Sequence, residues 1–330
     1  MPRDPRPARL GRALESVARV AFAARGPGGV VAIGRGGRTL WSHARGYADC
    51  ERRVPWSATT RSRAYSITKW LVGLGALELA RRDRLRLDDR VGVHLPTWRG
   101  PIATTPVRRL LDNTAGLRDY EAALWITGHG DRASVDLEQQ VALLAADWPR
   151  DLPCGAGRWY VNTGFRVADE LVRTLAHAEP ADWYRDALLR PHGARHATLE
   201  PYDDTAPGPL AVGYCDGPPR RRVLAHYGTL GDGGLVTSAA ELLAFEASVW
   251  AEPRLARALA SALELATLEG HTSSAASDLG ADRYALGLCA VASPAGPIVY
   301  HTGGGEGYRA LYARFVAHDL AVVVLGNRFP

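Results

Sequence analysis

The residues that could do chemistry in this chain begin with its single lysine. Lys69 is the only lysine in a sequence with 40 lysine and arginine residues. Arginine stays protonated in proteins, whereas a lysine that is buried or lies beside another cation can lose its proton and act as a base. Ser66 precedes Lys69 by three residues, and residues at this spacing share one face of a helix. The pair places an amine beside a hydroxyl, the minimum for activating a serine nucleophile, although Ser-x-x-Lys alone is a short, common pattern.

Two further short motifs follow this pair along the chain. Tyr160-Val161-Asn162 lies in a loop after Pro153 and Gly155, and His301-Thr302-Gly303-Gly304 ends a predicted strand near the C-terminus. Taken singly, each motif has an ordinary structural explanation as a core tyrosine or as a strand end. Their meaning depends on the elements that would bring them to Ser66.

The segments around these motifs give alternating strand and helix signals. Apolar stretches at 30–33 and 39–44 flank Gly36-Gly37, which predicts a hairpin. Leucines at helical spacing predict a helix over 66–82 that carries Ser66 and Lys69. Further helices are predicted at 8–24, 106–112, 136–147, 165–177, 180–189 and 238–264, and strands at 284–292, 298–301, 310–315 and 320–325.

Strands at both ends of the chain with helices between them predict the fold class. We expect an α/β protein of the α+β sandwich kind, in which one antiparallel sheet is built from both termini and a mostly helical region is inserted. At 330 residues the chain fits a single domain over 1–330. Within it, we expect a sheet subdomain at about 1–65 and 230–330 and a helical subdomain at about 66–229.

Composition narrows the class of protein. An apolar content of 46% and a charged content of 23% are typical of a soluble globular domain. The charge of +5 comes from scattered arginines without interleaved aromatics, which argues against nucleic-acid binding, and Arg220-Arg221-Arg222 is interpreted as a loop. No apolar run approaches a membrane span. The four cysteines are widely spaced without a CxxC pair, which predicts free thiols and no metal site.

The three motifs together resemble those of the serine β-lactamase and penicillin-binding-protein superfamily: Ser-x-x-Lys, Tyr-x-Asn and Lys/His-Thr-Gly. The resemblance is strongest to class C β-lactamases, D-alanyl-D-alanine carboxypeptidases and β-lactamase-like esterases, and it implies a β-lactamase/transpeptidase-like fold. Further stretches resemble the same family, namely Gly46-Tyr47-Ala48-Asp49, 110–117, 233–238 and 322–328.

The resemblance implies a role for each motif residue. Ser66 would be the nucleophile, and its own amide together with that of Gly304 would form the oxyanion hole. In such enzymes Lys69 and Tyr160 both border the serine, and a cationic lysine stabilises a phenolate, so either of them can take the serine proton. Asn162 would hold a substrate amide or orient Lys69. Thr302 and Gly303 complete the substrate-binding set.

Position 301 bears on the substrate. Many penicillin-recognising members carry a lysine there, a fixed cation for a substrate carboxylate, whereas a histidine is mostly neutral near pH 7. His301 therefore predicts carboxylate recognition that is weak or that strengthens as the pH falls toward about 6. Four aromatic residues (Trp125, His129, Trp148 and Trp159) are expected near the cleft, where they could bind an apolar acyl group or simply pack the core.

These observations predict a serine acyl-enzyme, a hydrolase or transacylase that acts on an ester or amide bond of a small molecule. Specialised metabolism is the setting that we expect for it. No cofactor, metal, nucleic acid or membrane is expected to take part. The alternative is a β-lactamase or a D-amino-acid peptidase/carboxypeptidase. The residues before 24 have no signal-peptide pattern, which predicts a cytoplasmic protein and lowers the expectation of this alternative. A non-catalytic ligand-binding member of the fold is the other alternative. Because the sequence ends soon after the last strand, helix 8–24 alone would cover one sheet face, which predicts a possible homodimer.

Overall fold

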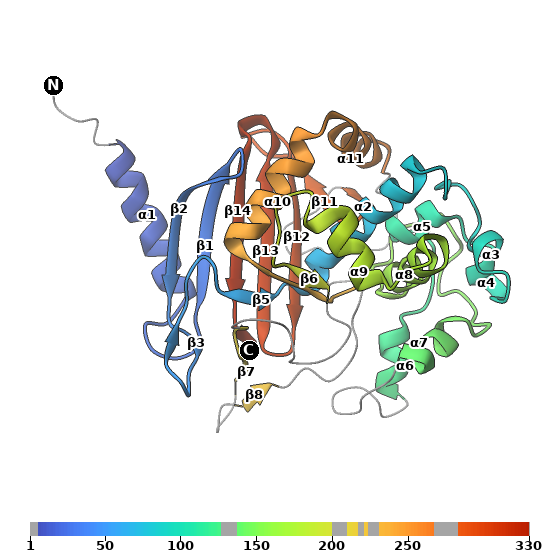
Figure 1. Cartoon of the computed structure of the whole chain (residues 1–330), viewed down its shortest axis with the longest axis horizontal. Helices are drawn as coiled ribbons and strands as arrows, with labels where there is room; N and C mark the ends of the chain where they lie inside the picture. The colour runs from blue at the N-terminus through green and yellow to red at the C-terminus, as the bar shows by residue number, and fades with distance from the viewer. Residues whose placement is uncertain are drawn as a thin grey trace.

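A seven-stranded antiparallel sheet forms the centre of the protein (Figure 1). The computed structural model describes residues 6–126, 137–199, 210–216, 221–223, 231–266 and 283–329. The strand order is β10-β11-β12-β13-β14-β1-β2. The strands are β1 (Gly29–Arg35), β2 (Arg38–Arg45), β10 (Arg283–Ala285), β11 (Leu288–Val291), β12 (Ile298–Gly305), β13 (Tyr308–Phe315) and β14 (Leu320–Gly326).

The pairing of β1 with β14 joins the two ends of the chain in one sheet. Ala32 lies opposite Val323 in this antiparallel ladder, and both side chains are buried. The β1–β2 hairpin was predicted from the glycine pair between its strands, and the C-terminal meander from the four strand segments predicted between 284 and 325. The predicted fold class, an antiparallel sheet from both termini with an inserted helical region, is confirmed.

The sheet is covered by helices from two parts of the chain. Helix α10 (Ala239–Ala251) packs across β1, β14 and β2, and α1 (Arg6–Ala21) lies beside β2 (Figure 1). The segment predicted as one helix over 238–264 is two, because Pro253 begins α11 (Pro253–Leu265) and Glu252 before it has an extended backbone. A proline inside a helix would lack the required backbone donor.

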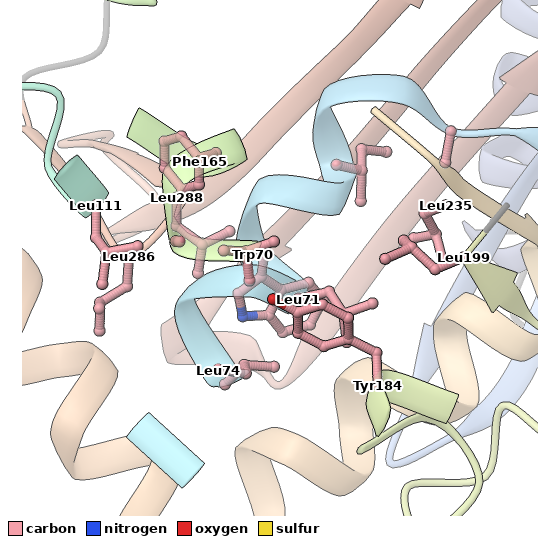
Figure 2. Packing of buried hydrophobic residues seen from close by; sticks show 14 of the residues in the cluster. Trp70, Leu71, Leu74, Leu111, Phe165, Tyr184, Leu199, Leu235, Leu286 and Leu288 are labelled. Atoms are coloured by element: carbon pink, nitrogen blue, oxygen red, sulfur yellow. The ribbon is translucent and has the colours of Figure 1, made fainter. Parts of the chain in front are cut away.

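Helix α2 (Thr68–Arg81) runs through the core and connects the sheet to the helical region. Its Trp70 ring stacks on Tyr312 of β13 with centroids 4.7 Å apart. Figure 2 shows Trp70, Leu71 and Leu74 among side chains from several elements. The helical region contains α3 (Val91–His94), α4 (Gly100–Ala103), α5 (Val107–Leu111), α6 (Tyr120–Ile126), α7 (Leu137–Leu144), α8 (Thr163–Ala176) and α9 (Pro180–Tyr184), followed by the π-helix η2 (Arg185–Leu189).

Several details differ from the sequence-based expectation. The predicted strand 284–292 is divided into β10 and β11 by a turn at Leu286 and Gly287, both with positive φ. Gly287 is required there because a Cβ would lie 2.1 Å from the Lys69 carbonyl carbon. Arg221 and Arg222, interpreted as loop residues, belong to strand β8 (Arg221–Val223), which pairs with β7 (Gly213–Cys215).

A small sheet that was not predicted lies beside the serine segment. Strand β9 (Leu235–Ser238) pairs with β5 (Arg61–Arg63) and with β6 (Thr198–Leu199). All four cysteines lie in the described part of the chain and are thiols. Among the helices within the described ranges, none has the length and apolarity to cross a bilayer. The proposed division into two subdomains stays a prediction.

Candidate active site

Ser66 lies in the 3₁₀ turn η1 (Tyr65–Ile67), which leads directly into α2. The α-helix itself begins at Thr68, two residues later than predicted. The Thr68 hydroxyl donates to the Tyr65 carbonyl at 2.5 Å and accepts from the Leu235 amide at 2.9 Å, so the turn is tied to β9. Tyr65 has φ of 45°, a conformation that costs energy in a non-glycine residue and persists where the surroundings enforce it.

Lys69 lies next to Ser66, as the i, i+3 spacing predicted. Its side chain is 0% exposed. The Nζ atom is 2.9 Å from Ser66 Oγ and 2.7 Å from the backbone carbonyl oxygen of Asp232. It also lies 5.2 Å from the ring centroid of Tyr160 and 5.7 Å from that of Phe165. The amine is therefore held against the serine hydroxyl in a site that is closed to bulk water on the helix side.

Tyr160 reaches the same pair from the loop before α8. Its hydroxyl interacts with Ser66 and with Lys69. Burial raises the pKa of Tyr160, and the nearby Lys69 charge and the hydrogen bonds to Ser66 and Lys69 offset this only in part. The resting side chain is thus a phenol that can pass a proton, not a phenolate.

Asn162 lies at the N-terminus of α8 and faces the cleft. Its Nδ2 donates to Glu121 Oε2 of α6 at 2.7 Å. Burial, followed by the charges of Asp232 and Asp119, raises the pKa of Glu121 to about 8. Glu121 was not predicted from the sequence, because a glutamate in a short amphipathic helix carries no signal of such burial. The Asn162 amide is therefore oriented by an acidic side chain.

His301 lies on β12 with its ring directed into the protein, and it is 1% exposed. Its Nδ1 lies 2.5 Å from the Thr302 carbonyl oxygen, which can only accept, so Nδ1 carries the proton and Nε2 accepts from the Tyr284 hydroxyl at 3.3 Å. Burial, and after it the Lys69 charge, lowers the pKa of His301 to about 3. The predicted gain of carboxylate recognition near pH 6 is therefore wrong, because His301 stays neutral far below that pH.

Gly303 brings β12 against the serine turn. A Cβ at position 303 would lie 1.9 Å from the Ala64 carbonyl oxygen and 3.3 Å from the Ser66 amide nitrogen, so only glycine allows this approach. A pocket of about 490 Å³ opens here. It is lined by Ser66, Tyr160, Asn162, Thr302, Gly303, Gly304, Arg309 and Ala310. Of the predicted site residues, six line this pocket. The other two, Lys69 and His301, are buried and do not line it.

A buried ionic group supports the Asp232 carbonyl behind Lys69. Arg166 of α8 is fully buried and lies 3.7 Å from Asp169 and 2.9 Å from Glu170. Asp169 accepts a hydrogen bond from the Gly231 amide, one residue before Asp232. This group was also missed from the sequence, although three charged residues at i, i+3 and i+4 on one face of a helix are a usable signal.

The predicted aromatic cluster does not surround Ser66 in the described structure. Trp148 and Trp159 are partly buried and are not among the described residues that line the serine pocket. His129 and the Trp125 side chain lie outside the described residues. Among the described residues, the pocket wall is therefore formed mostly by backbone and polar side chains.

The fold is that of the β-lactamase/transpeptidase-like class. The octameric penicillin-binding protein homologue from Pyrococcus abyssi superimposes with a TM-score of 0.79 at 21% identity, over 97% of this chain and 73% of that one. At this identity the likeness concerns the fold alone.

Sequence comparison identifies the family. The sequence model of the Beta-lactamase family matches residues 15–330. The chain therefore belongs to the Beta-lactamase family, which is of the serine-hydrolase type. A D-aminopeptidase of Cereibacter sphaeroides is 34% identical over 224 residues, 67% of this chain and 43% of that protein. A penicillin-binding protein of Bacillus subtilis is 24% identical over 91% of this chain and 68% of its own length. The chain thus spans less than half the length of the D-aminopeptidases that it matches.

Proposed function

We propose that the protein is a serine hydrolase that cleaves an ester or amide bond of a small molecule through an acyl-enzyme on Ser66. The observation that carries the proposal is the 2.9 Å contact between Lys69 Nζ and Ser66 Oγ at the floor of an open pocket. Geometry of this kind activates a serine hydroxyl as a nucleophile. The names of the relatives support amides of D-amino acids as the first substrates to test.

The proton path follows from the contacts of the two candidate bases. Ser66 Oγ bonds to the acyl carbon while its proton passes to the Lys69–Tyr160 pair, and the bond from the acyl carbon to the leaving oxygen or nitrogen then breaks. Tyr160 donates its phenolic proton to the leaving group and regains a proton from Lys69. This order is favoured because burial raises the pKa of Tyr160, which keeps it protonated before attack. Water or another acceptor then attacks the acyl carbon and loses a proton to the Lys69–Tyr160 pair, and the bond between the acyl carbon and Ser66 Oγ breaks as Oγ regains a proton. The identity of the acceptor distinguishes a hydrolase from a transacylase.

The direct test is intact-mass detection of a covalent adduct. Wild type and Ser66→Ala are incubated with a fluorophosphonate and with a panel of esters, D-amino-acid amides and β-lactams. We expect one adduct per wild-type chain, mapped to Ser66, and none on the variant. Turnover of Ser66→Ala within about tenfold of wild type would show that another residue is the nucleophile. Cytoplasmic location, specialised metabolism and a homodimer stay predictions.

A further inference from the structure

Tyr160 reaches Ser66 from a loop that has no regular secondary structure. Residues 145–162 join α7, which ends at Leu144, to α8, which begins at Thr163, and they contain no helix or strand. The backbone on either side of Tyr160 is therefore not held by a helix or by a sheet ladder. A tyrosine that exchanges a proton with a serine must keep its hydroxyl within hydrogen-bond reach of it, so another part of the chain must fix this backbone.

Asn113 holds the backbone amides on both sides of Tyr160. Its carbonyl oxygen accepts a hydrogen bond from the Trp159 amide at 2.8 Å. Its side-chain Oδ1 accepts a second one from the Val161 amide at 3.3 Å. These two hydrogen bonds form the Asn113 clamp, which fixes the residue before and the residue after the tyrosine.

The conformation of Asn113 accounts for its residue type. Its φ is 57°, in the left-handed region that asparagine adopts more readily than most residues other than glycine. The side chain is buried, and its Nδ2 has no hydrogen-bond partner among the described residues. A buried donor without a partner is destabilising. Glycine would suit this backbone without such a donor, but only a side chain with an acceptor oxygen can also bind the Val161 amide.

The clamp is fixed to the helix that follows the tyrosine. Asn113 comes just after α5, and its own amide donates to the Leu110 carbonyl at 3.4 Å. A Cβ at Gly164, in the first turn of α8, would lie 2.7 Å from the same Leu110 carbonyl oxygen. Helices α5 and α8 therefore approach each other closely here. The Tyr160 backbone is held between Asn113 and the start of α8.

We propose that Asn113 is a positioning residue for Tyr160 and keeps the Tyr160 hydroxyl at Ser66 and Lys69 during acyl transfer. The proposal rests on the proposed function of Ser66. Among the described residues, Asn113 is not one of those that line the Ser66 pocket. Its effect on the reaction therefore passes through the Tyr160 backbone and not through contact with a substrate.

The decisive variant is Asn113→Gly. Glycine allows the positive φ, keeps the backbone carbonyl that binds Trp159 and removes both the Oδ1 acceptor and the unpaired donor, so the variant should fold. We expect its acylation rate with a 4-nitrophenyl ester, in single turnover, to fall about tenfold, because a small misplacement of a catalytic group costs up to about 100-fold. The substrate dissociation constant should change little.

A double-mutant cycle separates positioning from general stability. The same acylation rate is measured for Tyr160→Phe and for Tyr160→Phe/Asn113→Gly. Without the hydroxyl that it positions, the loss of the Asn113 side chain should change the rate less than about twofold. Equal losses in the two backgrounds overturn the proposal, and so does an unchanged rate in folded Asn113→Gly.

The matched control is Asp83→Gly. It replaces another residue in the left-handed region, with φ of 56° and an exposed side chain just after α2. This substitution should leave the acylation rate and the substrate dissociation constant unchanged.

Hydrogen–deuterium exchange tests the clamp without any turnover. In Asn113→Gly the Val161 amide loses its acceptor, whereas the Trp159 amide keeps the backbone carbonyl of residue 113. Exchange at Val161 should therefore accelerate about fivefold or more relative to exchange at Trp159, the size of one lost hydrogen bond. An unchanged ratio of the two exchange rates overturns the proposal. A wild-type chain that forms no acyl-enzyme would contradict the function proposed for Ser66, and the exchange ratio would still show whether Asn113 holds the Tyr160 loop.

Discussion

Lys69 Nζ donates to the backbone carbonyl of Asp232 at 2.7 Å, a contact across 163 residues of sequence. The Asp232 side chain is bonded to the Tyr120 hydroxyl at 2.7 Å, and the preceding Gly231 amide is bonded to Asp169. The position of the amine at Ser66 therefore depends on a loop that is anchored from two helices. Because the Asp232 backbone carbonyl is uncharged, it can orient the Lys69 amine without placing another charge beside it.

Asp169→Asn should show whether this anchor positions Lys69. Removing one partner of a buried ion pair costs about 3 kcal/mol of unfolding free energy. We also expect kcat to fall about tenfold with little change in KM, because the Asp232 carbonyl loses its fixed position. Thermal unfolding and steady-state kinetics measure the two effects. The control is Glu170→Gln, which disturbs the same Arg166 but has no bond to Gly231. Equal losses of kcat in both variants would mean that the effect is general destabilisation.

Lys69→Arg keeps the positive charge and removes the proton chemistry. We expect kcat/KM to fall at least ~100-fold, the lower range for a lost general base. The side chain is fully buried, so a guanidinium also crowds the site. Lys69→Met, similar in length without the amine, therefore serves as the second variant. An active Lys69→Arg beside an inactive Lys69→Met would show that Lys69 acts through its charge alone.

Tyr160→Phe deletes only the hydroxyl that contacts Ser66 and Lys69. We expect the acylation rate, measured by single-turnover kinetics, to fall about 100-fold while the substrate dissociation constant changes little. Because burial raises the pKa of Tyr160, the wild-type rate should show no Tyr160 titration between pH 6 and 9. Weaker binding with an unchanged chemical step would make Tyr160 a recognition residue.

His301 should make the stability of the protein dependent on acid pH. Its folded pKa of about 3 is below the unfolded value of 6.5, so the unfolded chain binds more protons between these values. The free energy of unfolding therefore falls as the pH decreases from about 6.5 toward 3, by about 3 kcal/mol at pH 4. His301→Gln should lose this component. Denaturant unfolding of wild type and His301→Gln at pH 7 and pH 4 measures this component. If both proteins lose the same free energy of unfolding between these pH values, His301 does not contribute to the acid dependence.

Gly303→Ala should separate β12 from the serine turn. The added Cβ would lie 1.9 Å from the Ala64 carbonyl oxygen, which is backbone and cannot move aside freely. We expect a loss of adduct formation by mass spectrometry and a lower melting temperature. Gly11→Ala is the control, since its Cβ meets no atom of the described residues within 4 Å and alanine favours the helix. Normal adduct formation by Gly303→Ala would show that the close approach is not needed.

The sequence by itself determined the local features and the overall layout. The i, i+3 spacing of Ser66 and Lys69 fixes their contact within one helical segment, because helix geometry depends only on neighbouring residues. Strand segments at both ends of the chain, with helices between them, predicted the shared sheet. The break at Pro253 could also have been predicted, because a proline lacks the backbone donor that a helix interior requires. The π-helix after α9 continues a predicted helix with another hydrogen-bond pattern.

Only the tertiary structure decided which distant groups surround the serine. The Asp232 carbonyl carries no side-chain signal, and nothing near Arg309 in the sequence marks it as a pocket residue. The neutrality of His301 likewise depends on burial by Tyr284 and on the nearby Lys69 charge. Charge, burial and hydrogen bonding between such residues arise from packing across many residues of chain, and spacing along the sequence does not encode that packing.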